Sequence, residues 1–177
     1  MSRLTARLSS ARTLGAALAT VAGTVLAAVL MAVLAVPSPA QAVTKLTDAQ
    51  AASQLSAAGI TRTSSGGCTD RYTSTCTSYD QINQSTVSGI ITYKHASGCA
   101  VNITGGTETG HASGTYSHWN GYKVDISRST CNDSWIRSAY TYIGLRGDGY
   151  PMYQAASGNV YTNEGSHWDI VYYTCGC

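Results

Sequence analysis

Two short segments of this chain hold residues that could bind a metal ion and activate water. Residues 117–125 contain His118 and Asp125, and a second segment contains Glu164 and His167. Two imidazoles and one carboxylate form a three-ligand set that suits zinc and leaves the fourth tetrahedral position open to water. The Glu164 carboxylate could accept a proton from that water. These residue types therefore predict a hydrolytic metal centre.

The spacing of these residues restricts the elements that can carry them. His118 and Asp125 are seven positions apart, which separates them by two turns if they share one helix. A loop that carries His118 and turns at Gly121 into a strand bearing Asp125 brings them together more easily. Glu164 and His167 are three positions apart and could converge from the approach to another strand. We therefore expect loop-and-strand geometry around the metal.

The hydrophobic pattern is consistent with that geometry. Tyr122, Val124 and Ile126 alternate with Lys123 and Asp125, which predicts a strand that turns Asp125 toward a cleft.

The rest of the pattern predicts a mixture of helices and strands. Helices are expected over residues 48–58, from Ser78 to Gly98, and from Asn132 or Asp133 to Gly144. Further short strands are expected over residues 100–104, 152–156, 159–162 and 168–173, with a hairpin turn at Ser157-Gly158. This order predicts an α+β fold, with a small antiparallel sheet flanked by helices and stapled by disulfides.

The first 42 residues have the features of a secretory signal peptide. Arg3, Arg7 and Arg12 precede an apolar run over residues 14–36, and Ala40-Gln41-Ala42 supplies a cleavage site. The apolar run is also long enough for a retained membrane anchor, which is the alternative. We expect cleavage after Ala42, which leaves a single secreted domain over residues 43–177 with no further membrane contact.

The charge of this domain argues against a nucleic-acid partner. Three of the eleven basic residues belong to the leader, so the remainder is close to neutral and has no basic cluster. We expect an extracellular protein that works as a monomer.

The cysteines are typical of an exported chain. An even number of them in a secreted domain predicts three disulfides, although spacing alone leaves the connectivity open. Cys68 and Cys76 could close a short loop, whereas Cys175 and Cys177 are expected to tie the C-terminus to the body. The six cysteines are Cys68, Cys76, Cys99, Cys131, Cys175 and Cys177.

The two site segments resemble a known family of zinc peptidases. The histidine-x6-aspartate spacing of His118 and Asp125, and the Glu164-x-x-His167-Trp168 segment, are similar to the signatures of the zinc D-Ala-D-Ala peptidases and their relatives. Those relatives include D-Ala-D-Ala carboxypeptidases and dipeptidases, phage L-Ala-D-Glu endopeptidases, and the lysostaphin and hedgehog groups. The resemblance covers roughly residues 102–126 and 161–171.

The resemblance carries specific expectations. It implies that His118, Asp125 and His167 bind Zn²⁺ and that Glu164 is the catalytic base. It also implies a small antiparallel sheet flanked by helices, and a substrate that is a peptidoglycan peptide cut near a D-amino acid by D,D- or L,D-peptidase activity. The expected protein is thus a secreted zinc metallopeptidase, a hydrolase of the cell wall.

The chain departs from the family at one position that bears on activity. Many relatives have an arginine in the loop after the strand that precedes the histidine. In this chain the corresponding segment, residues 103–108, has Glu108 instead. That arginine is expected to polarise the scissile carbonyl or to hold a substrate carboxylate. A basic residue from elsewhere could substitute for it, and the candidates are Arg71, Lys94, Arg137 and Arg146. Its absence also motivates an alternative function, a secreted binding or inhibitory module with a structural or vestigial zinc site.

Some neighbouring residues are weaker candidates for contact with substrate. Glu108 and His111 repeat the acid-x-x-histidine spacing in a glycine-rich loop, where His111 could adjoin the metal, contact substrate, or simply be a mobile loop histidine. Ser117 and Trp168, which adjoin His118 and His167 in the sequence, are also candidates for contact with substrate. Asp169 is expected to support the site or the strand rather than to bind the metal.

Overall fold

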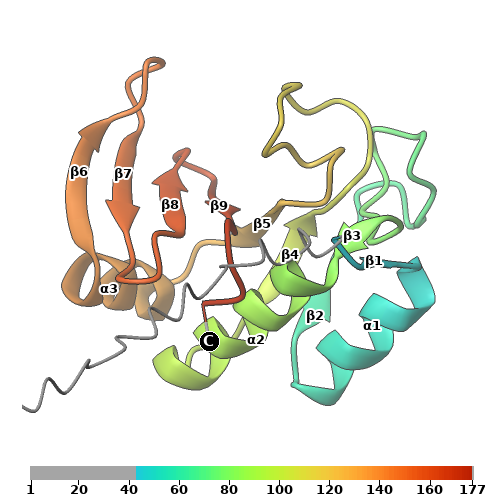
Figure 1. Cartoon of the computed structure of the whole chain (residues 1–177), viewed down its shortest axis with the longest axis horizontal. Coiled ribbons are helices and arrows are strands. Elements are labelled where there is room, and N and C mark those ends of the chain that lie inside the picture. The colour runs from blue at the N-terminus through green and yellow to red at the C-terminus, as the bar shows by residue number, and fades with distance from the viewer. Residues whose placement is uncertain (1–42, 177) are drawn as a thin grey trace, which may run out of the picture. The chain divides into compact units, whose positions relative to one another are not determined.

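The structure is a computed structural model that describes residues 43–176. The expected signal peptide over residues 1–42, and Cys177, lie outside the described residues. Within the described part, the order of elements is β1 (Lys45–Leu46), α1 (Asp48–Ala57), β2 (Thr61–Arg62), β3 (Ile82–Asn83), α2 (Gln84–Ser97), β4 (Asn102–Gly105), β5 (Lys123–Ser127), α3 (Thr130–Ala139), β6 (Thr141–Leu145), β7 (Pro151–Gln154), β8 (Val160–Asn163) and β9 (His167–Val171). Figure 1 shows these elements in chain colours.

Over residues 43–176 the strands form one large sheet and one small one. The large sheet has seven strands in the order β2-β4-β5-β9-β8-β7-β6, and β1 pairs with β3. All neighbours in the large sheet are antiparallel except β2 and β4, which are parallel. The expected α+β fold with a mostly antiparallel sheet is therefore confirmed.

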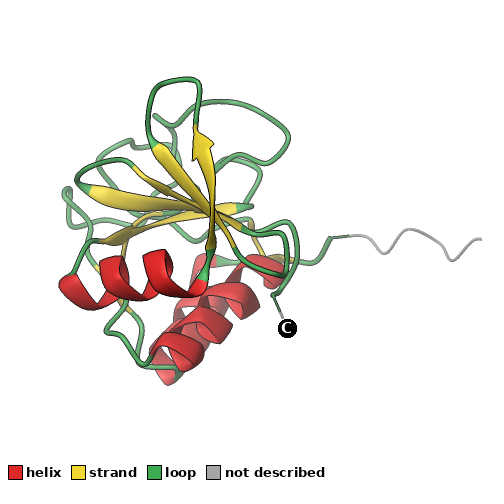
Figure 2. Cartoon of the chain, turned by 90° about the vertical axis from the view of Figure 1, so that its left-hand side faces the viewer, coloured by secondary structure: helices red, strands yellow, loops and turns green. Residues whose placement is uncertain are grey.

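The helices of the described chain lie together on one side of the large sheet (Figure 2). They and the sheet share a single apolar core. From the strands it includes Ile126, Trp168 and Ile170, and from α2 it includes Val87 and Ile90. Because alternate strand residues point to opposite faces, the neighbouring polar residues of β5 and β9 point to the open face. The open face is where a site can form.

Local sequence explains most helix ends. Thr47 caps α1 and forms a reciprocal capping box with Gln50, and Gly59 follows the helix with a positive φ of 70°. Gly98 ends α2 in the left-handed conformation, as expected. The predicted start of α2 at Ser78 is wrong, because residues 78–81 lead into β3 and the helix begins only at Gln84.

The C-terminal end of α3 is also corrected. The helix expected to continue to Gly144 stops at Ala139, and Thr141–Leu145 is instead the edge strand β6. Its pairing with β7 supplies backbone hydrogen bonds that a helix would have to make internally. The aromatic and β-branched residues Tyr142 and Ile143 also favour a strand.

Two disulfides are present among the described residues. Cys68 bonds to Cys76 and closes a short loop, as expected, and Cys99 bonds to Cys131. The second bond joins the end of α2 to the start of α3. These four cysteines pair among themselves, and the expected tie from Cys175 and Cys177 to the body involves Cys177, which lies outside the described residues.

A search of the described residues for membrane-spanning segments finds no helix with the length and apolar character to cross a bilayer.

Candidate metal centre

Strands β5 and β9 bring the two sequence segments together. They are adjacent and antiparallel, with Asp125 directly opposite Asp169 and Ser127 opposite His167. Asp125 and Asp169 therefore share the open face of the sheet, and His167 lies on the same face of β9 as Asp169 because it is two positions earlier. Sequence positions some forty residues apart thus meet through strand pairing.

Glycines allow the backbone to bring His118 to this face. Gly121 has a φ of 76°, and a Cβ there would lie 2.4 Å from the carbonyl oxygen of Gln81, so the turn between His118 and Asp125 needs glycine. After β4, the Gly106 carbonyl accepts a hydrogen bond of 2.7 Å from Nδ1 of His118. That bond makes Nδ1 the donor, so Nε2, which faces the acids, is the nitrogen that could bind a metal.

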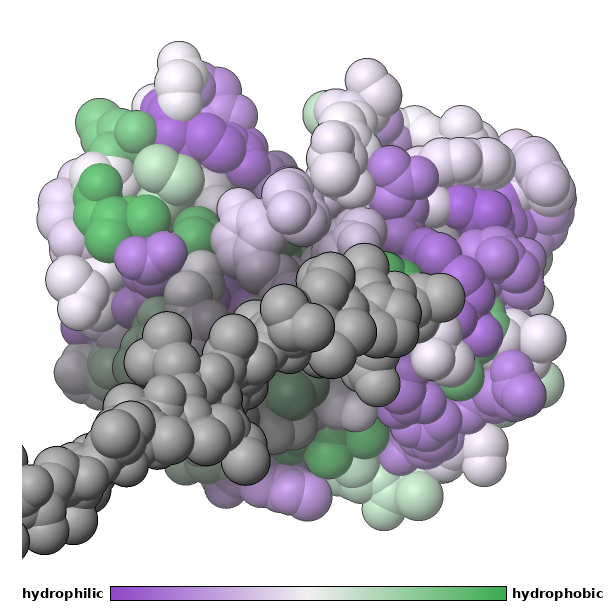
Figure 3. Space-filling view, in the orientation of Figure 1, coloured by the Kyte–Doolittle hydropathy of each residue, from purple (hydrophilic) through white to green (hydrophobic). Residues whose placement is uncertain are grey.

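The open face carries a pocket of about 470 Å³. The pocket lies between the β6–β7 hairpin and the loop that follows β4, and a hollow is visible between these two parts in Figure 3. Its titratable lining consists of three histidines (His111, His118, His167), four carboxylates (Asp125, Asp148, Glu164, Asp169) and two cations (Lys123, Arg146). With neutral histidines this lining is net negative, which favours a bound cation.

Three of the four sequence-predicted site residues meet at a single oxygen atom. Oδ1 of Asp125 lies 3.3 Å from Nε2 of His118 and 3.6 Å from Nε2 of His167. Ligand atoms about 2.1 Å from a shared zinc ion would lie roughly 3.4 Å apart at tetrahedral angles. Both distances to Asp125 are therefore close to those between two ligands of one ion, although the group whose ligand atoms all lie within 4.8 Å of one another is His111, His118 and Asp125.

Buried oxygens without hydrogen bonds indicate the same position. Among residues 43–176, Oδ1 of Asp125 and Oδ1 of Asp169 are buried and accept no hydrogen bond, and the latter lies 3.7 Å from Nε2 of His118. A buried carboxylate oxygen without a donor is costly, whereas a metal ion would satisfy it. The donor set present thus fits a divalent metal with nitrogen and oxygen ligands, such as zinc.

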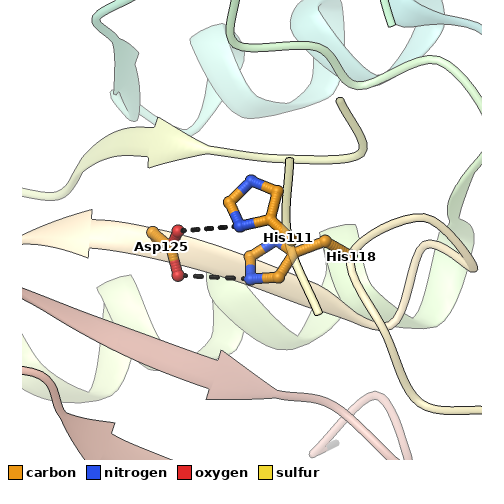
Figure 4. A group of neighbouring side chains, drawn as sticks. All are labelled: His111, His118 and Asp125. Atoms are coloured by element: carbon orange, nitrogen blue, oxygen red, sulfur yellow. Dashed lines mark ion pairs between the residues drawn. The ribbon is translucent and has the colours of Figure 1, made fainter. Parts of the chain in front are cut away.

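His111 approaches the same carboxylate from the other side. Its Nδ1 lies 3.9 Å from Oδ2 of Asp125, and His111, His118 and Asp125 form a compact group that could hold a metal ion. Figure 4 shows the two imidazoles side by side, each facing one carboxylate oxygen. The rings are stacked, with centroids 3.8 Å apart and planes at 15°. His111 therefore adjoins the candidate metal centre. This is one of the alternatives expected for His111 from the sequence.

The acids around His118 control its protonation in the metal-free protein. Burial lowers the pKa of His118, but Asp125 and Asp169 beside it outweigh this effect and raise the pKa to about 10. Burial raises the pKa of Asp169, while His118 and Lys123 lower it more strongly, so the net pKa is well below its usual range. Without a metal, the centre therefore retains a proton on His118.

Glu164 lies at the rim of the pocket with both oxygens engaged. Its Oε2 is 3.2 Å from Nε2 of His167, and its Oε1 is 2.5 Å from the guanidinium of Arg146. Arg146 also contacts Oδ2 of Asp169 at 3.0 Å, and Lys123 contacts the same oxygen at 2.6 Å. Two cations thus stand beside the candidate ligands and the candidate base.

Three residues suggested for substrate contact are largely structural. Trp168 is wholly buried in the core, where its indole N–H donates to Asp133, so its predicted contact with substrate is wrong. Glu108 is buried and accepts hydrogen bonds from the backbone N–H groups of Ser78 and Gly106, which fix the loop. Ser117 is also buried.

Glu108 also orients His111. Its Oε1 lies 3.1 Å from Nε2 of His111. Burial raises the pKa of Glu108, but the hydrogen bonds from His111, Ser78 and Gly106 outweigh it and hold the pKa below its usual value. The ionised carboxylate of Glu108 accepts a hydrogen bond from Nε2–H of His111. The other ring nitrogen, Nδ1, therefore faces Asp125.

The pocket includes residues that the sequence pattern did not single out as site residues. Asp169 was expected to act only in support, and Arg146 was one of several basic residues that could reach the site. Strand alternation could have identified Asp169 as a pocket residue, because it is two positions after His167 on β9 and therefore lies on the same face. Lys123 precedes Asp125 by two and follows the same rule. Arg146 lies in a hairpin whose position no local pattern gives.

Comparison with protein-family models, with curated proteins and with solved structures finds no match to this chain.

Proposed function

We propose that this protein is a secreted zinc-dependent peptidase that hydrolyses a cell-wall peptide near a D-amino acid. In this proposal His118, Asp125 and His167 bind the zinc ion, and Glu164 is the general base. The observation that carries it is the approach of both imidazole nitrogens to one buried oxygen of Asp125. Peptidoglycan as the substrate rests on the sequence resemblance alone, and secretion rests on the leader-like N-terminus together with the disulfides.

The stacking of the two imidazoles favours His167 over His111 as the third ligand. A metal ion lies close to the plane of each imidazole that binds it, along the nitrogen lone pair. The planes of His111 and His118 are nearly parallel, with centroids 3.8 Å apart, so one ion cannot lie near both planes. In this conformation His111 supports the ring of His118 rather than sharing its metal.

A bound zinc ion would supply a water of lowered pKa and would polarise the scissile carbonyl. Glu164 stands beside His167, and in this proposal its carboxylate would take a proton from that water and pass it to the leaving amine. The buried acids keep the position of His118 fixed, and its Nδ1–H bond to Gly106 keeps the required tautomer.

We infer that Arg146 takes the role of the missing loop arginine. Of the candidates Arg71, Lys94, Arg137 and Arg146, the pocket includes only Arg146. Its guanidinium could hold a substrate carboxylate or a carbonyl oxygen once it leaves Glu164. We infer that Arg146 and Lys123 together provide the positive side of the substrate site.

One observation favours the alternative, a binding or inhibitory module with a structural or vestigial zinc site. Both oxygens of Glu164 are engaged, by Arg146 and by His167, so the base is not free as it stands. In an enzyme, substrate must release Glu164 from Arg146. In a binding module, the same contacts would simply hold the site closed.

Digestion of purified muropeptides separates the two functions. An enzyme gives a new product by mass spectrometry, and the product disappears with a chelator and in Glu164→Gln, while zinc binding by that variant stays within about threefold of wild type. Asp70→Asn is the matched control, because Asp70 accepts hydrogen bonds only inside its own exposed loop. No chelator-sensitive product from any stem peptide would exclude the peptidase.

A further inference from the structure

A second pocket adjoins the candidate metal centre and has a different character. It has a volume of about 230 Å³ and shares Gly110 and His111 with the metal pocket. Because the two pockets share these wall residues, one extended ligand could occupy both. The second pocket thus lies next to the bond that the centre would cut.

An exposed aromatic ring forms one wall of this second pocket. Trp119 lines it and is 40% exposed, and Tyr72, which is 75% exposed, meets the indole edge-on at a centroid distance of 5.7 Å. Large aromatic rings held in water beside a pocket are a common sign of a ligand surface.

The indole is held in place from the protein side. The guanidinium of Arg71 lies 3.7 Å from the centroid of the Trp119 ring. Arg71 also donates hydrogen bonds to the carbonyls of Thr107 and Trp119, so its own position is fixed. A ligand that meets this indole therefore meets a pre-ordered surface, which lowers the entropy cost of binding.

The rest of the lining selects the chemistry of the ligand. Apart from Trp119 and the shared histidine, it consists of one carboxylate, Glu108, and of small polar or glycine residues such as Thr109, Ser113 and Asn120. No Lys or Arg lines it, which disfavours an anion, and no aliphatic side chain lines it, which disfavours an apolar ligand. A neutral ring with one apolar C–H face and a rim of hydroxyls matches both the indole and the polar lining.

We propose that this second pocket is a saccharide subsite in which a pyranose ring stacks on Trp119. The identity of the substrate rests on the proposed peptidase function. A peptidase with this subsite would act on a glycopeptide. An extended chain advances about 3.3–3.6 Å per residue, so a sugar in the adjoining pocket places the cut bond within the first few residues of the attached peptide. The stem would therefore be cut close to its sugar end.

Isothermal titration of the Glu164→Gln protein, which binds without turnover, tests the subsite. The probes are muramyl dipeptide, the same dipeptide without its sugar, and N-acetylglucosamine alone. We expect the glycopeptide to bind at least about tenfold more tightly than the bare dipeptide. Trp119→Ala added to this background should abolish that preference and leave the affinity for the bare dipeptide unchanged. Tyr142→Ala is the control, since Tyr142 is exposed on β6 and lines neither pocket.

The outcomes separate this inference from the proposed function. Equal affinity for the two dipeptides, or a preference that survives Trp119→Ala, overturns the subsite. Tyr72→Ala provides a second variant that leaves the buried structure intact if Trp119→Ala unfolds, and it should weaken the preference. Sugar-dependent binding by a wild-type protein that hydrolyses nothing would keep the subsite and reject the peptidase.

Discussion

Asp125 and Asp169 stand directly opposite each other on β5 and β9, and each has a buried Oδ1 atom that accepts no hydrogen bond. Like charges at such a cross-strand position are destabilising. Lys123 and Arg146 contact Asp169 at its Oδ2 atom and not at Oδ1. The strand pairing that builds the sheet thus creates a demand for positive charge, which the proton on His118 meets in the metal-free protein and a metal ion would meet in its place.

That demand predicts tight binding of one divalent ion. Replacing His118 by Ala removes a ligand nitrogen, and replacing Asp125 by Asn removes the negative charge of the ligand oxygen, so zinc affinity should fall by about 100-fold or more. Titration with zinc, with metal content measured after dialysis, checks this. His95→Ala is the control, because His95 is exposed in the last turn of α2 and should leave one zinc per chain. Unchanged binding in the His118 variant would contradict the assignment.

The pKa of His118 predicts an unusual pH dependence for the metal-free protein. The unfolded value is near 6.5, and the folded value is about 10. The folded state therefore binds more protons between these values, so its stability is full below pH 6.5 and declines as pH rises toward 10. We expect a loss on the order of 2 kcal/mol between pH 7 and 9, seen as a lower Tm in the presence of a chelator.

Saturating zinc should flatten this slope. Zinc competes with the proton on His118, so zinc stabilises the fold more as pH rises. His118→Gln removes the titrating group, and its metal-free Tm should vary much less over the same range. A wild-type slope that matches the His118→Gln slope would show that His118 does not hold the proton.

Glycine at position 105 makes room for the metal-binding carboxylate. A Cβ on Gly105 would lie 2.3 Å from Oδ2 of Asp125, so Gly105→Ala must displace that side chain. We expect zinc affinity to fall at least about tenfold, with a stability loss of about 1–3 kcal/mol from overpacking. Gly147→Ala is the control, because its Cβ would meet nothing within 4 Å. Equal zinc affinities for the two variants would argue against this packing role.

Local patterns predicted the strand face of the site well. The alternation of Tyr122, Val124 and Ile126 with Lys123 and Asp125 correctly placed both polar residues on the pocket side. That success follows from the two-residue period of a strand, which needs no knowledge of the partner strand.

Tertiary pairing explains where the patterns failed. Residues 140–145 continue the helical spacing of α3, but pairing with β7 makes them strand β6 and projects Arg146 into the pocket. Trp168 looked like a substrate contact because it adjoins His167, yet strand alternation turns it into the core. No single segment of the sequence indicates that β6 pairs with β7, or how far this hairpin lies from β9.

The disulfide between Cys99 and Cys131 predicts a stability difference that can be measured without substrate. It closes a longer loop than Cys68–Cys76, with sequence separations of 32 and 8. On the chain-entropy account, removing it should cost about 4 kcal/mol, against about 2.5 kcal/mol for the short loop. Urea unfolding of the Cys99→Ala/Cys131→Ala and Cys68→Ala/Cys76→Ala double variants compares the two. If the short-loop variant proves the less stable, constraint of the unfolded chain is not the main effect, and the local fixing of the loop beside Arg71 matters more to the fold.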